Sequence, residues 1–207
     1  MTSRTMMGKL LILGPVGIMA SWLIWGGVLG FPDQGDHAAM VAAVSQNAEI
    51  TKWLLGLAAF FMFLMVAGLA GLRNTMTGGF GSDYAAMGVL IVIMSAAFGL
   101  GEIALTIVAG DVGSAGNPAV ATTIYLAGNG IGAISTAGLF LGFTAIGLGV
   151  YIQKNHNTII AVLLTASGLF GLVLALYDYG SQLMVISFVA MTISMVAIGV
   201  STLRSSD

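Results

Sequence analysis

Six runs of apolar and small residues follow one another along this chain of 207 residues. A helix of about 20 such residues crosses the hydrocarbon core of a bilayer, which is about 30 Å thick. The runs cover approximately residues 10–30, 51–72, 85–109, 120–150, 158–177 and 182–203. They leave no room for a folded soluble domain. The sequence therefore predicts an all-α, polytopic bundle of six transmembrane helices, with residues 1–207 forming a single integral membrane domain.

The composition supports the same class of protein. Hydrophobic residues make up 58% of the chain and charged residues only 7%, whereas soluble domains carry about 25% charged residues because they must face water. The mean hydropathy is +1.03. Most of the surface must then face membrane lipids or other apolar helices, and we expect the protein to be integral to a bacterial or archaeal cell membrane.

The basic residues predict the orientation of the bundle. With six spans, one side of the membrane receives five of the six basic residues and the other receives only Lys52. Cytoplasmic loops carry the excess of Lys and Arg, so both termini are predicted to be cytoplasmic. The five residues on that side are Arg4, Lys9, Arg73, Lys154 and Arg204.

Two segments outside the apolar runs carry helix signals. Residues 36–50 contain neither Gly nor Pro and are predicted to be helical, either as an interfacial helix or as an outward extension of the second span. Asp36 is the expected N-cap, because its side chain can accept a hydrogen bond from the first turn. Ser82 or Asp83 is expected to cap the third span in the same way.

Several functional classes are disfavoured by what the chain lacks. The net charge is −2 and there is no basic run, so neither a nucleic-acid partner nor a surface for anionic lipid headgroups is expected. The chain has no cysteine, and His37 and His156 fall in polar, loop-like stretches. We therefore expect no metal site, no cofactor and no enzymatic activity.

A single carboxyl group, Glu102, lies within the third apolar run. Residues three and four apart share a helix face, which places Glu102 on a stripe with Ser95, Gly99 and Thr106. Turning an acid toward lipid costs at least about 2.5 kcal/mol. Glu102 is therefore expected to face another helix.

The fourth run offers the polar partner for Glu102. Tyr125 and Asn129 share one helix face there, and Glu102 and Asn129 are each predicted to lie about 12–14 Å below the outer surface at about 1.5 Å per residue. Glycines at the small-xxx-small spacing would let the two helices approach closely. The predicted packing positions are Gly99, Gly128, Gly132, Gly138 and Gly142.

Two interpretations of this pair of helices remain open. In the functional one, Glu102 is a proton or cation site that opens toward the outside, with Asn129, Tyr125 and Thr106 as neighbours. In the structural one, a neutral Glu102 donates a hydrogen bond to Asn129 and fastens the two helices together, because burial favours the neutral carboxyl.

The predicted outer side also gathers acidic residues, among them Asp111 and Asp178, opposed by Lys52 alone. Such a face could attract cations toward a vestibule. Acidic residues are equally the ordinary content of outer loops, from which basic residues are excluded by the topology rule.

The stretch GLGVYIQKNHNTIIAVLLTASGLFGLVLALYDY, from the end of the fourth run through the fifth, and the overall layout of spans resemble bacterial six-span membrane proteins grouped as a domain of unknown function. That resemblance implies a fold and no activity. From the residues we expect a non-enzymatic multi-pass protein that acts by helix packing, as a subunit of a homo-oligomer or an accessory protein of a larger membrane assembly. The alternative is a small proton- or cation-coupled transporter or channel that uses Glu102.

Overall fold

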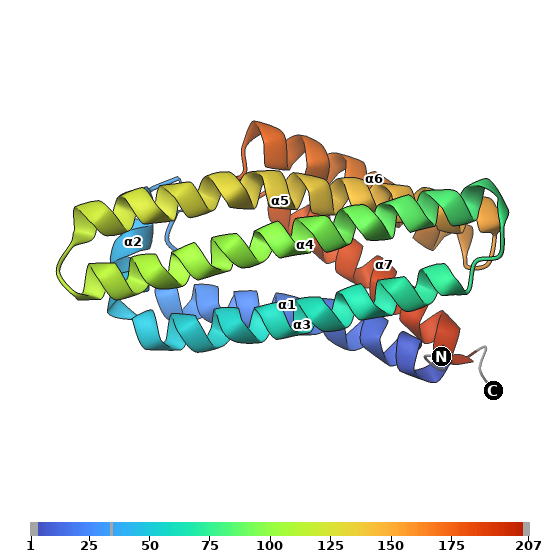
Figure 1. The fold of residues 1–207 in the computed structure, drawn as a ribbon, viewed down its shortest axis with the longest axis horizontal. Coiled ribbons are helices and arrows are strands. Elements are labelled where there is room, and N and C mark those ends of the chain that lie inside the picture. Colours follow the sequence, from blue (N-terminus) through green and yellow to red (C-terminus); the bar gives the residue numbers. More distant parts are fainter. Residues whose placement is uncertain (1–3, 34, 205–207) are drawn as a thin grey trace.

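The computed structural model describes residues 4–33 and 35–204, which form seven α-helices and no strand (Figure 1). Six of these helices are long and apolar enough to cross a membrane. The predicted all-α bundle of six spans is thus confirmed. The helices are α1 (Arg4–Leu29), α2 (His37–Gln46), α3 (Ala48–Asn74), α4 (Gly79–Ser114), α5 (Pro118–Gln153), α6 (Thr158–Tyr177) and α7 (Met184–Arg204).

The six long helices pack in a closed ring, in the order α1, α3, α4, α5, α6, α7 and back to α1. Figure 1 shows the start of α1 and the end of α7 at the same end of the bundle. We call this end, with Arg4, Lys9, Arg73, Lys154 and Arg204, the basic end, and the opposite one the far end. An even number of spans requires both termini on one side of the membrane.

The helices of the ring differ greatly in length. α4 and α5 have 36 residues each, whereas α6 and α7 have 20 and 21. At about 1.5 Å per residue, the first pair is about 54 Å long and the second about 30 Å. The α6–α7 hairpin therefore ends partway along α4 and α5, as Figure 1 shows. The ring is complete only over the half of the bundle nearest the basic end.

In the half of the bundle nearest the far end, α2 packs in the part of the ring that α6 and α7 do not reach. Asp36 caps it, with Ala39 N–H donating to the Asp36 carboxylate at 3.0 Å. The helix ends at Gln46, and α3 begins two residues later at Ala48. The segment predicted to be helical is thus mostly a separate helix, packed mainly against α4 and α5, rather than a straight extension of α3.

The interior divides into two apolar cores. The first occupies the complete half of the ring and centres on fully buried Phe140, Phe143 and Leu164. The second occupies the far half, where Val44 of α2 packs with Trp25 and Leu55. The Trp25 indole N–H donates to Thr51 at 3.1 Å and joins α1 to α3 there.

The start of α4 differs from the prediction. The helix begins at Gly79, after Gly78 with φ +63°, and not after Ser82 or Asp83. Gly81 is buried against Gly149 and Gln153 of α5. Packing on α5 supports an additional helical turn that the local capping signal did not predict.

Candidate functional site

The α4–α5 hairpin is an antiparallel pair whose facing residues recur every seven positions. On α4, Gly81, Gly88 and Ser95 face α5 at this interval, and on α5 they meet Gly149, Gly142 and Ser135. The Ser135 hydroxyl donates to the Ser95 carbonyl at 2.9 Å, at a buried position between the two helices. A seven-residue repeat of contacts is typical of helices packed as a coiled coil, and small side chains allow the backbones to approach closely.

The five glycines that the sequence singled out all lie on this contact. A Cβ atom on Gly99 would lie 3.0 Å from the Ser135 hydroxyl, and one on Gly128 would lie 3.2 Å from Leu105. A Cβ on Gly138 would overlap Ser95, and one on Gly142 would come within 2.8 Å of the Gly88 carbonyl. Gly132 is the one that meets Glu102.

The carboxyl group of Glu102 lies directly over Gly132. A Cβ atom on Gly132 would overlap that carboxyl group, so the glycine creates the space in which the acid sits. The hydroxyl of Tyr179, in the loop between α6 and α7, donates to Glu102 Oε1 at 2.7 Å. Glu102 is thus held between α4, α5 and the α6–α7 loop.

Other polar side chains surround this pair. Thr136 lies beside the Tyr179 hydroxyl, and Asn129 lies beside the hydroxyl of buried Tyr125. The ring of His37, the first residue of α2, lies 6.1 Å from the Tyr125 ring between centroids, and its Nδ1 atom is buried without a hydrogen-bond partner among the described residues. We call Glu102, Tyr125, Asn129, Thr136 and Tyr179 the polar cluster.

Thr106, the third predicted neighbour, is buried one turn from Glu102 toward the far end. The predicted pairing differs from the observed one. Tyr179 donates the hydrogen bond to Glu102, whereas Asn129 lies beside Tyr125.

The depth of Glu102 also differs from the prediction. It lies 12 positions before Ser114, the last residue of α4, or about 18 Å along the helix. Yet it is level with the α6–α7 loop, because Tyr179 reaches it from there. Relative to the short hairpin, Glu102 lies at the end of the span and not deep within it.

Asp111 and Asp178 do not form one acidic face. Asp111 lies near the tip of α4 and forms an ion pair with Lys52 at 3.6 Å. Asp178 directly follows α6, near the level of Glu102. The unequal helix lengths separate these two acids along the bundle axis, and no group of three potential metal ligands occurs among residues 4–33 and 35–204.

Chemically, the polar cluster combines one carboxyl, two phenols, an amide and a hydroxyl group. These groups can exchange a proton or contribute oxygen ligands to a cation. On the side toward the basic end, the first apolar core begins, with Phe140 and Phe143 fully buried within the ring. The cluster therefore lies at the boundary between two apolar cores.

Reasoning from the sequence missed Tyr179 as the partner of Glu102, and Gly81, Gly88 and Gly149 as packing positions. The seven-residue spacing of small residues on both helices was the available signal for the glycines. For Tyr179 the available signal was run length. The last two runs are shorter than the third and fourth, so the loop between them, which contains Tyr179, can end level with residues inside the third run.

Searches against protein-family models, curated proteins and solved structures found no match for this chain.

Proposed function

We propose that this integral membrane protein is a non-enzymatic subunit or accessory protein of a membrane assembly, and that it binds its partner through the part of the α4–α5 hairpin that extends past α6 and α7. We call this part, residues 103–130, the tip. The partner is a further membrane subunit or a second copy of the chain.

The observation that carries this proposal is an apolar surface on the tip. α6 and α7 have the length that matches a hydrocarbon core of about 30 Å. The tip extends about 18 Å beyond their loop and nevertheless exposes Val108, Val120 and Leu126, at 44%, 53% and 44%. Apolar side chains that emerge from the lipid are stabilised when a partner covers them.

Co-purification in mild detergent tests the proposal. We expect the wild-type chain to elute in a complex larger than its own 21.1 kDa, and the double variant Val120→Asp and Leu126→Asp to elute alone with unchanged helical circular dichroism. Phe80→Asp is the matched control, because Phe80 is 80% exposed at the basic end. A wild-type monomer, or a complex that survives the tip substitutions, would contradict the proposal.

The second candidate function is a small proton- or cation-coupled transporter or channel. The polar cluster favours it, because Tyr179 donates to Glu102, and Tyr125 with its partner Asn129 lies nearby. Ionisable residues within membrane spans commonly mark ion or proton pathways. The packed Phe140 and Phe143 weigh against it, because they occupy the ring between the cluster and the basic end.

Flux measurements in proteoliposomes separate the two functions. A transporter would show proton- or cation-dependent flux that Glu102→Gln abolishes, while the tip substitutions leave it intact. The assembly role predicts no such flux and a Glu102→Gln variant that still forms the complex.

A further inference from the structure

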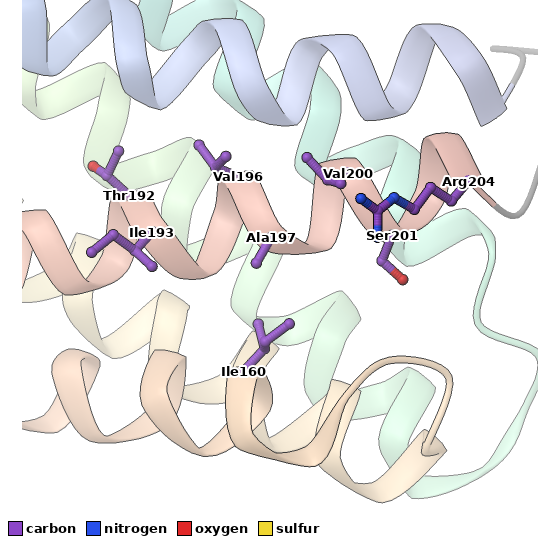
Figure 2. Close-up of a pocket in the computed structure, with 8 residues that line it drawn as sticks. All are labelled: Ile160, Thr192, Ile193, Val196, Ala197, Val200, Ser201 and Arg204. Atoms are coloured by element: carbon purple, nitrogen blue, oxygen red, sulfur yellow. The ribbon is translucent and has the colours of Figure 1, made fainter.

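A shallow groove of about 720 Å³ runs along the outward surface of α7. Ile160 of α6 and Ile193, Ala197 and Val200 of α7 line it with apolar side chains (Figure 2). From Thr192 to Arg204 the groove extends over 12 positions, or about 18 Å. This is about half of the hydrocarbon thickness, so the groove covers the depth of one leaflet.

The groove ends in polar groups at the basic end. Ser201 and Arg204 are part of its lining, and Figure 2 shows the Arg204 side chain turned back along α7 toward Val200 and Ser201. His156, from the α5–α6 loop, lies with its Nδ1 atom 3.3 Å from the Ser201 hydroxyl oxygen. An apolar groove with a cation and a hydroxyl group at its interfacial end is chemically complementary to a phospholipid, which has apolar acyl chains and a phosphate.

The electrostatics at this end favour an anion. Gly8 of α1 packs against Gly199 of α7, which brings Arg4 and Lys9 at the start of α1 close to the end of α7. The only ion pair between described residues, Lys52 with Asp111, is at the far end. The guanidinium of Arg204 therefore has no carboxylate partner within residues 4–33 and 35–204.

We propose that this groove binds one anionic phospholipid from the leaflet at the basic end. One acyl chain lies along Ala197 and Val200, and the phosphate accepts hydrogen bonds from Arg204 and Ser201. A guanidinium pairs with phosphate through two parallel hydrogen bonds, and the positive charge of Arg204 favours a lipid with net negative charge over a zwitterionic one. A second copy of the chain fits less well, because a two-fold contact through α7 would bring the two Arg204 side chains together.

Native mass spectrometry of the full chain in detergent, titrated with phosphatidylglycerol or with phosphatidylcholine of the same acyl chains, tests this site. We expect one phosphatidylglycerol to bind about fivefold more tightly than phosphatidylcholine, the preference that one cation near a membrane surface supplies. Arg204→Gln should remove this preference. Arg73→Gln is the control, because Arg73 lies at the same end on α3.

Filling the groove provides an independent test. Ala197→Leu should weaken binding of both lipids, whereas Ala166→Leu, which adds the same volume at an exposed position on α6, should leave binding unchanged. Equal affinities of the wild type for the two lipids, or a preference that survives Arg204→Gln, would overturn the proposal. So would a dimer ion that Ala197→Leu removes, because the occupant would then be a second copy. If Ala197→Leu does not fold, the Arg204→Gln comparison decides alone.

Discussion

At the scale of single residues, Glu102 illustrates how a membrane bundle accommodates an acid. Gly132 leaves the space for its carboxyl group, and Tyr179 supplies a hydrogen bond from a segment 77 residues away in the sequence. A buried polar group in an apolar environment costs free energy unless it is paired. The same contact attaches the end of the short α6–α7 hairpin to the middle of α4.

Removing the Tyr179 hydroxyl should therefore destabilise the bundle. We expect Tyr179→Phe to lower the free energy of unfolding by about 1 kcal/mol. This value lies between the contribution of an average hydrogen bond in a membrane protein and the larger cost of leaving a buried acceptor unpaired. Denaturation in mild detergent measures it. Tyr177→Phe is the matched control, since Tyr177 is 86% exposed, and equal stability of the two variants would contradict the assigned role.

His156 should make stability depend on pH. Burial lowers the pKa of His156 below its ordinary value of 6.5. As the pH falls below 6.5, the unfolded chain binds a proton that the folded state resists, so protonation favours unfolding. We expect the Tm to fall between pH 7.5 and 5.5, and to fall less in His156→Gln. Identical Tm profiles for the two proteins would show that His156 does not contribute.

At the scale of elements, the α4–α5 pair depends on small side chains at seven-residue intervals. Gly88 and Gly142 approach so closely that a Cβ atom on either would lie within 2.8 Å of the other's carbonyl oxygen. Membrane helices gain little from the hydrophobic effect between themselves and associate through such close packing. Each of these positions therefore needs a residue small enough for the two backbones to meet.

A pair of neighbouring glycines on α5 tests this view. Gly132→Leu should destabilise the protein by about 1–3 kcal/mol or more, because the new side chain overlaps the Glu102 carboxyl. Gly130→Leu should not, because open space surrounds a Cβ atom there. Both changes raise helix propensity equally, so the difference in unfolding free energy isolates packing. No difference would mean that the interface is misassigned.

At the scale of the whole molecule, the long helices differ in how far they extend along the bundle axis. Six helices reach the basic end, whereas α6 and α7 end partway along α4 and α5, and α2 and the start of α3 pack beside the α4–α5 tip. The apolar run of α5 thus continues past the level at which α6 and α7 end. Hydropathy along α5 alone does not reveal this boundary.

Cysteine accessibility can locate that boundary, since the chain has no native cysteine. In proteoliposomes, we expect a membrane-impermeant maleimide to label Thr123→Cys on the tip but not Leu141→Cys, although both positions are exposed on α5. Asn155→Cys, in the loop at the basic end, should be labelled only from the opposite side. Labelling of Leu141→Cys, or labelling of Thr123→Cys and Asn155→Cys from the same side, would contradict the arrangement.

The apolar runs alone determined that this chain forms six spans, because only hydrogen-bonded helices satisfy the backbone within lipid. Local signals also identified the Asp36 cap and five of the glycines that line the α4–α5 contact. These features depend on composition and on spacing within one helix, both of which are local properties.

Only the tertiary structure decided which residue pairs with Glu102, how far α4 and α5 extend, and that α2 fills the ring where α6 and α7 end. Each depends on the relative height of helices that are distant in the sequence. That height is set by the packing of side chains across helices, such as Gly81 on Gly149, and apolar runs of similar composition carry no local information about it.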